Sequence, residues 1–305
     1  MLLINYLQIC NFNYHKNTST IEVQAKNYNL INMKNEKTSF EEYKSVKDYT
    51  QKIFVGNDEK MVSLKLQEEE IRKIEIGLRH EQFYFIVDII NFKIIRAKGM
   101  ETMGYSSDTF DMMNYVQSIP SKGIIQLMIL MFKNIIEFNI EDKRLLQFMK
   151  PKFISQIPMR DAGGSIKLVK RTISPFQYNN EGQIIEYISE YVVVKNKFDN
   201  DPPEPRFSDV PSDLQEKFDL LISNAFTKDH SPFSPKLLEV IKMYAKAKPD
   251  DLIDKIAQKL KIKVSTLQYY NKEIMIKAKE FLGEYYNFAT AKEVAIFLKK
   301  CGILQ

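Results

Sequence analysis

One stretch near the C-terminus carries polar and basic side chains at helical spacing. It reads KVSTLQYYNKEIMIKAKEF and covers residues 263–281. If the stretch is a helix, Gln268 and Lys272 share a face, because residues four apart lie one above the other. A glutamine amide can bond an adenine edge with two hydrogen bonds, and a lysine ammonium can bind a phosphate. The chemistry indicated is contact with DNA, and an ordinary amphipathic helix of a soluble domain is the alternative.

The two faces of this helix differ in polarity. The inner face would carry Val264, Leu267, Asn271, Ile274 and Ala278, and the outer face Ser265, Gln268, Tyr269, Lys272 and Ile276. We expect the inner face to pack and the outer face to be free to enter a major groove. The N-terminus of a helix carries a partial positive charge, so it would lie near a phosphate.

Basic charge is concentrated in the same part of the chain. Residues 231–305 hold 14 Lys and no Arg against 8 Asp and Glu, a net charge of +6. The whole chain carries +5, so the other 230 residues are near −1. Such asymmetry is typical of a module that binds a polyanion, although a lysine-rich solvated surface gives similar counts.

A supporting helix is expected directly before this one. The segment IAQKLKIK, residues 256–263, predicts a helix in which Ala257 permits a close crossing and Leu260 fills the core. Two or three residues then separate it from a helix that begins at Ser265. This is the spacing of a helix-turn-helix.

Two further helices complete a small bundle. Ser234 is a predicted N-cap with Pro235 at the first helical position, which is a strong start signal. Thr290 and Glu293 have the spacing of a capping box for the last helix. Together these signals predict four helices within residues 231–305.

This C-terminal part resembles the LuxR/GerE-type helix-turn-helix of bacterial transcriptional regulators. FSPKLLEVI at 233–241 is similar to the opening Thr-Pro-x-x-x-Glu-Val-Leu motif of that family. IAQKLKIKVSTLQ at 256–268 is similar to its Ile-Ala-x-x-Leu-x-Ile-Ser core, and TAKEVAIFLKKCGIL at 290–304 to its closing dimerisation helix. The resemblance implies that Gln268, Tyr269 and Lys272 face the bases of DNA. It also implies that Ser265 and Thr266 contact phosphate groups. The candidate DNA-binding residues are Lys263, Ser265, Thr266, Gln268, Tyr269, Lys272 and Lys277.

Upstream, the pattern changes to strands. FYFIVDIINFKIIRAKG at 83–99 predicts a hairpin, and SKGIIQLMILMFKNIIEFNIE at 121–141 a long helix that Ser121 could cap. Three extended runs follow, KPKFISQIPMR, SIKLVKRTISPFQY and QIIEYISEYVVVK, separated by the turn sequences DAGG and NNEG. The order predicts one α+β domain over residues 81–197.

This order and the segment MGYSSDTF at 103–110 resemble a PAS domain, which implies a sensory or dimerising role. Residues 100–160 contain no Cys or His, so neither a flavin adduct nor an axial haem ligand is expected there, and we predict no cofactor. Met128 and Met131 of the long helix could line an adaptable pocket, but we favour gap-filling core positions. A small molecule or a protein partner of this domain stays open.

The remaining segments set the domain limits. The proline-rich stretch at 196–213 predicts an interdomain boundary, with a linker and connector helix over 198–230. Residues 33–80 are expected to be a helical segment whose stripe of Ile71, Ile74 and Leu78 packs either on the sheet or on a second subunit. We expect residues 1–32 to be disordered or not translated, with Met33 as the initiator.

The sequence also argues against several function classes. There is no phosphate-binding glycine loop, His-rich metal spacing or nucleophile motif, so we do not expect an enzyme or a metal site. The longest apolar run, IIQLMILMF at 124–132, is too short to span a membrane, and Cys10 and Cys301 form no metal or disulfide framework.

Together, the patterns and the two resemblances predict a cytoplasmic protein of class α+β: a PAS-like antiparallel sheet with flanking helices, followed by an all-α four-helix helix-turn-helix domain. Its expected function is that of a homodimeric, sequence-specific regulator that binds double-stranded DNA. In the alternative, a degenerate helix-turn-helix serves as a protein-interaction or dimerisation module.

Overall fold

The computed structural model describes residues 41, 43–52, 59–141, 146–208, 210–227, 231–248 and 253–304. The expectations for residues 1–32 and for Met33 therefore lie outside the described residues. Within the described ranges, no helix is long and apolar enough to cross a membrane.

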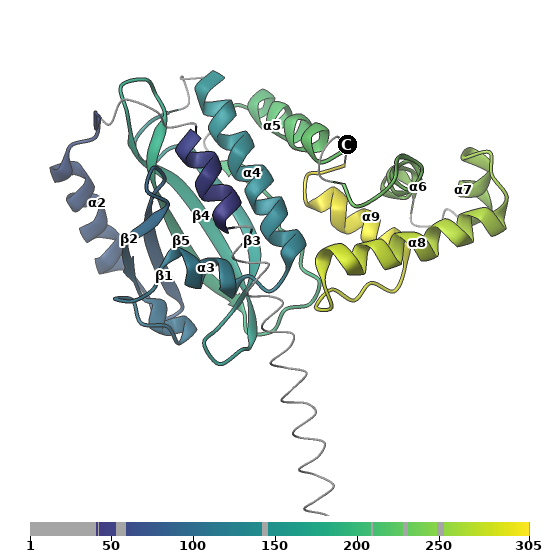
Figure 1. Ribbon diagram of the computed structural model, residues 1–305, viewed down its shortest axis with the longest axis horizontal. Coiled ribbons are helices and arrows are strands. Elements are labelled where there is room, and N and C mark those ends of the chain that lie inside the picture. The colour runs from purple at the N-terminus through teal and green to yellow at the C-terminus, as the bar shows by residue number, and fades with distance from the viewer. Residues whose placement is uncertain are drawn as a thin grey trace, which may run out of the picture.

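An antiparallel sheet forms the larger half of the molecule (Figure 1). Its strands are β1 (Gln82–Asp88), β2 (Lys93–Lys98), β3 (Lys152–Arg160), β4 (Ile166–Tyr178), β5 (Ile184–Lys195) and β6 (Arg206–Ser208). Their order across the sheet is β2-β1-β5-β4-β3-β6. The first hairpin thus pairs with the last strand of the meander, and the helices between β2 and β3 cross one face. This arrangement confirms the predicted α+β class with a PAS-like sheet.

Strand β1 places apolar side chains on both faces of the sheet, because successive side chains of a strand point to opposite sides. Phe83 and Phe85 point to the inner face and belong to the main core, whereas Tyr84 and Ile86 point to the outer face. The predicted turns after β3 and β4 are formed by Gly164 and Gly182, whose φ angles of 88° and 81° favour glycine. A sheet with two apolar faces needs a cover on each side.

Helices α3 (Met112–Ser118) and α4 (Lys122–Glu141) cover the inner face, after a short 3-10 turn, η1 (Met100–Met103). Local chemistry fixes where they begin. Asp111 accepts a hydrogen bond from the backbone N–H of Asn114 in a full capping box. Ser121 Oγ accepts one from Ile124 N at 3.2 Å, as expected for the cap of the long helix.

Helix α2 (Leu64–Gly77) covers part of the outer face (Figure 1). Ile71 is buried there in a second apolar cluster with Tyr84, Ile86 and Ile188, and Ile74 and Leu78 pack against it. Of the two alternatives for this stripe, packing on the chain's own sheet is therefore the one observed.

The expected linker is more ordered than its prolines indicate. Residues 206–208 form β6, which pairs with β3 in the register Phe153↔Phe207. The connector helix is present as α5 (Ser212–Ala225), and it contacts α4. Its Phe218 packs edge-on against Phe153 and Phe207, with ring centroids 5.9 and 4.9 Å apart. These contacts attach the connector to the sheet.

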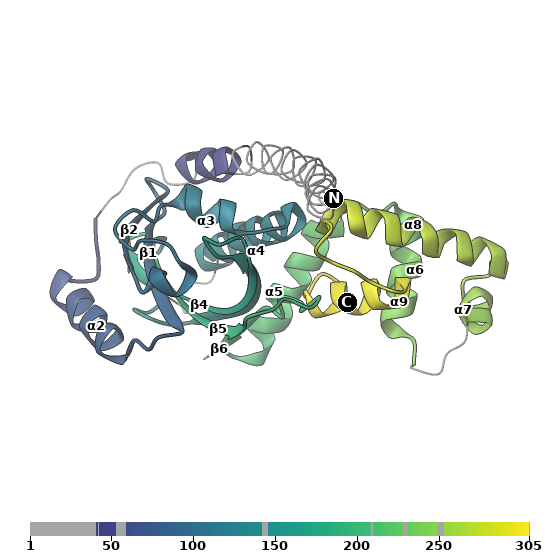
Figure 2. The same ribbon diagram turned by 90° about the horizontal axis from the view of Figure 1, so that it is seen from below.

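Four helices follow in the described part of the C-terminal region: α6 (Pro235–Lys246), α7 (Ile253–Lys259), α8 (Val264–Leu282) and α9 (Ala291–Lys300). Ser234 and Thr290 cap α6 and α9 as predicted. Helix α8 runs away from the sheet, with its C-terminal end beside α4 and its N-terminal end beside α7 (Figures 1 and 2). The contact with α4 is close, since a Cβ built at Gly123 would lie 2.4 Å from the backbone oxygen of Phe281.

Candidate nucleic-acid interface and ligand cavity

The turn between α7 and α8 is held by the backbone. Leu260 N and Ile262 N donate to Ile256 O and Ala257 O, each at 3.0 Å, and Lys261 adopts a φ of 55°. These bonds satisfy carbonyls at the end of α7 while the chain reverses. Ala257 and Leu260 are buried, as the spacing predicts. Helix α8 begins at Val264, one residue before the predicted start.

The two faces of α8 are divided largely as predicted. Leu267, Ile274, Ala278 and Leu282 are buried, while Val264 and Asn271 are half-buried. Four predicted site residues come together on the outer side, where Ser265, Gln268, Tyr269 and Lys272 line a shallow hollow with Asn271. Tyr269 is 59% exposed although it is a large aromatic residue. The N-terminal half of α8 thus presents amide, hydroxyl, aromatic and ammonium groups to solvent.

The other three candidates differ from this group. Lys263 is exposed at the N-cap position, and no side chain caps the first turn of α8. Thr266 is half-buried. Lys277 lies more than a turn beyond Lys272, and its Nζ pairs with Glu280 Oε2 at 2.8 Å. The uncapped first turn leaves backbone N–H groups that an anion can use, whereas Lys277 already has an anionic partner.

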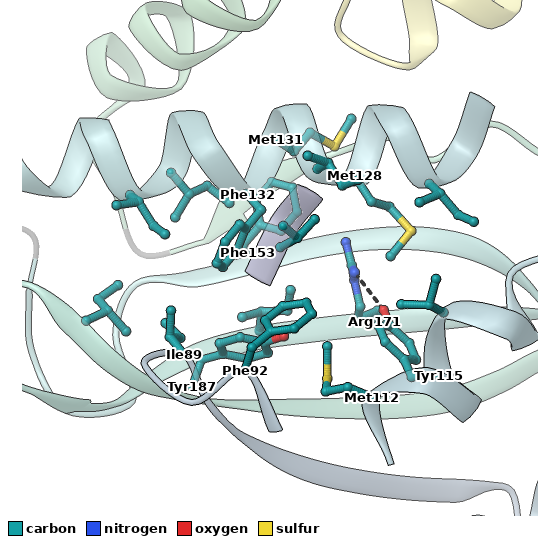
Figure 3. Close-up of a pocket in the computed structure, with 18 of the residues that line it drawn as sticks. Ile89, Phe92, Met112, Tyr115, Met128, Met131, Phe132, Phe153, Arg171 and Tyr187 are labelled. Atoms are coloured by element: carbon teal, nitrogen blue, oxygen red, sulfur yellow. Dashed lines mark hydrogen bonds between the residues drawn. The ribbon is translucent and has the colours of Figure 1, made fainter. Parts of the chain in front are cut away.

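A cavity lies between α4 and the inner face of the sheet (Figure 3). Its volume is about 130 Å³, roughly ten times what one ordered water needs. Aliphatic and aromatic side chains from the sheet and from α3 and α4 form most of its wall. Met131 is buried in the main apolar core and Met128 packs against it, as favoured, but both residues also line this cavity.

One end of this cavity is polar. Arg171 of β4 is only 6% exposed, and its guanidinium rises from the sheet toward α4, between Tyr115 and Met128 (Figure 3). Its Nη1 donates to Tyr115 Oη at 3.0 Å, and its Nε donates to Ser155 Oγ at 3.2 Å. Burial acts to lower the pKa of Arg171, but the nearby tyrosines, Tyr115 first, outweigh it and the pKa lies above its ordinary value. Arg171 is therefore a buried cation.

Sequence reasoning did not identify Arg171. The strand SIKLVKRTISPFQY places Lys170 and Arg171 side by side, and strand alternation requires them to point to opposite faces. The run alone does not tell which of the two is buried. The inward position follows only from the cross-strand neighbours of Arg171, Ser155 on β3 and Tyr191 on β5.

No family model matches this chain, and no curated protein matches it either. A search of solved structures found matches at low sequence identity and low TM-score. A complex of Vibrio cholerae VqmA with ligand and DNA is 14% identical, with 77% of this chain and 89% of that chain covered and a TM-score of 0.26. A V. cholerae VqmA dimer without target DNA, whose description refers to LuxR-type receptors, is 12% identical, with 77% of this chain and 90% of that chain covered and a TM-score of 0.27. Escherichia coli SdiA is 13% identical, with 80% of this chain and 93% of that chain covered and a TM-score of 0.23. These similarities carry no argument about function, which is inferred below from the side chains of this chain.

Proposed function

We propose that this chain is a dimeric, sequence-specific DNA-binding regulator of transcription, with DNA binding modulated by its PAS-like domain. The observation that carries the proposal is the exposed face of α8. Gln268, Tyr269 and Lys272 project from the second helix of a helix-turn-helix, away from the bundle core. A recognition helix reads bases with side chains of this kind near its N-terminus.

Charge supports the same proposal. The basic excess of the chain belongs to residues 231–305, where exposed Lys272 lines the hollow on α8 and Lys263 is exposed at the N-cap position of the same helix. Phosphate contacts from such lysines position a protein on DNA without reading its sequence. Base preference would then come from Gln268 and Tyr269.

The dimer is proposed from the resemblance of α9 to a closing dimerisation helix. Ile296 on α9 is 42% exposed, although the other face of the helix packs against α6 and α8. Two recognition helices in such a dimer would read half-sites about 34 Å apart, one helical turn of DNA. The operator should therefore be an inverted repeat.

Selection from a random pool of duplex DNA with the purified full chain tests this proposal. Enrichment of an inverted repeat is the expected result, and it would also supply the operator. Retention of DNA without an enriched motif would reduce the site to a basic surface. No retention at low salt would favour the alternative, a protein-interaction module, for which exposed Tyr269 and Ile276 are suitable contact residues.

Substitution of Gln268 makes the test specific to α8. Gln268→Ala should relax the preference at one base pair, at a cost of about 1–3 kcal/mol on the preferred operator. Gln258→Ala is the matched control, because Gln258 is exposed on α7, the helix that does not enter the groove. An unchanged base preference in Gln268→Ala would overturn the role given to this residue.

A further inference from the structure

The cavity beneath α4 has one charged group in its wall. Of the residues that line it, only Arg171 is ionic at neutral pH, and the rest are apolar or tyrosine side chains. In the part of the chain that the structure describes, no carboxylate pairs with Arg171. Burial removes the hydration of this cation, and the two groups that it bonds in exchange, Ser155 and Tyr115, are neutral, so an anionic ligand would supply the missing counter-charge.

The donors of Arg171 are only partly used. A guanidinium has five N–H donors. Ser155 Oγ takes one and Tyr115 Oη takes another, and no other described residue accepts from the rest. The two bonded groups hold the guanidinium in one orientation, and the remaining N–H groups can bind two oxygens of one planar anion side by side. Tyr115 Oη, which accepts from Arg171, keeps its own proton for donation.

The far end of the cavity has the opposite character. Ile89, Phe92 and Phe132 lie away from Arg171 along the cavity (Figure 3). An occupant that satisfies both ends has an anionic head and an apolar body. The single guanidinium can neutralise one negative charge of a ligand but not two. A carboxylate, which carries one charge, is therefore favoured over a phosphate dianion, which carries two.

We propose that this cavity binds an apolar monocarboxylic acid, whose carboxylate pairs with Arg171 and Tyr115 and whose hydrocarbon part lies under α4. The role of this acid as the signal for DNA binding rests on the proposed function. The binding of the acid in the cavity is independent of that function.

Calorimetric titration of the full chain tests the proposal with matched pairs of ligands. The probes are straight-chain carboxylic acids of about four to about twelve carbons, chosen to span the size of the cavity, and the primary amide of each. We expect at least one acid to bind about tenfold or more tightly than its amide, which is about 1.4 kcal/mol. Equal affinity for acid and amide, or no binding of any acid, would overturn the proposal.

Substitution then assigns the effect to one side chain. Arg171→Gln should lower the affinity for the acid to that for the amide and leave amide binding unchanged. Arg206→Gln is the matched control, because Arg206 is exposed on β6 next to the lining residue Phe207. Undiminished acid binding in Arg171→Gln would refute the assignment, and if this variant does not fold, the comparison of acid and amide on the natural chain decides.

A DNA-binding measurement with and without the tightest acid separates the two proposals. Selective acid binding by a chain that binds no DNA would overturn the proposed function and leave the cavity assignment standing. Specific DNA binding by a chain that binds no acid would overturn the cavity assignment and leave the proposed function standing.

Discussion

Glu75 adds a polar connection between α2 and the outer face of the sheet. Its Oε1 accepts hydrogen bonds from Tyr84 Oη at 2.6 Å and Arg96 Nη2 at 2.9 Å, and Lys98 Nζ lies 3.4 Å from Oε2. The bond from Tyr84 is the largest cause that lowers the pKa of Glu75 below its ordinary value of 4.5, and Arg96 adds to it against the effect of burial. The ionised carboxylate is thus preferred in the folded state.

This preference predicts a pH-dependent stability. A carboxyl whose pKa is lower in the folded state stabilises the protein above its unfolded pKa and loses that effect as the pH falls through the folded value. We expect Glu75→Gln to cost about 1 kcal/mol above pH 5, with the difference from the natural chain shrinking below pH 4.5. Thermal unfolding of both proteins from pH 7 down to about pH 3.5 checks this.

Glu68→Gln is the control for that series. The Glu68 side chain is 65% exposed, and its distance of 3.4 Å from Arg96 Nη1 makes a longer ion pair than that of Glu75. The substitution should change the unfolding temperature little at any pH. A Glu75→Gln difference that stayed constant into the acid range would show that the charge of Glu75 is not what stabilises α2.

At the scale of elements, α4 and α8 cross closely where the two parts of the molecule meet. Gly123→Ala would place a methyl group 2.4 Å from Phe281 O, and backbone cannot move aside as a flexible side chain can. We expect a loss of about 1–3 kcal/mol, typical of overpacking, seen as a lower unfolding temperature.

Gly77→Ala is the matched control for this crossing. A Cβ built at Gly77, in the last turn of α2, meets no atom within 4 Å. The substitution should be neutral or slightly stabilising, because alanine is the better helix former. If both variants unfolded like the natural chain, the close contact of α4 with α8 would be contradicted.

The elements could be predicted from sequence where their signals are local. Ser234 with Pro235, and Thr290 with Glu293, mark helix starts through groups three residues apart or less, and the structure has α6 and α9 there. β6 could not be predicted, because its pairing of Phe207 with Phe153 joins residues far apart in sequence across a proline-rich segment. The inward position of Arg171 was missed for the same reason, since its neighbours are on other strands.

At the scale of the whole molecule, α4 connects the cavity to α8. Met128 and Phe132 of α4 border the cavity, while Gly123 in the first turn of the same helix meets Phe281. Polar contacts reinforce this connection, because Asn287 N donates to Asn200 Oδ1 at 2.9 Å and Arg160 Nη2 donates to Tyr285 Oη at 3.1 Å. These contacts lie near the C-terminal end of α8, so the proposed DNA-reading end is left free.

The charge distribution of the whole chain leads to the last prediction. Because the sheet half is nearly neutral and the C-terminal half is basic, DNA affinity should come from lysines around α8 and fall steeply with salt. The logarithm of the binding constant declines by about 0.9 per logarithm of salt for each phosphate contact. Lys272→Ala should reduce this slope by about 0.9 per subunit if its ammonium meets a phosphate.

Titrations of one operator at several salt concentrations measure these slopes. Lys277→Ala should change the slope less, because Glu280 already holds Lys277 at 2.8 Å. Lys170→Ala is the control, since Lys170 is exposed on β4 of the sheet half, and it should leave the slope unchanged. Equal slopes for the natural chain and Lys272→Ala would remove Lys272 from the interface, whereas equal reductions in all three variants would mean that DNA is attracted by the net charge of the chain and not by α8.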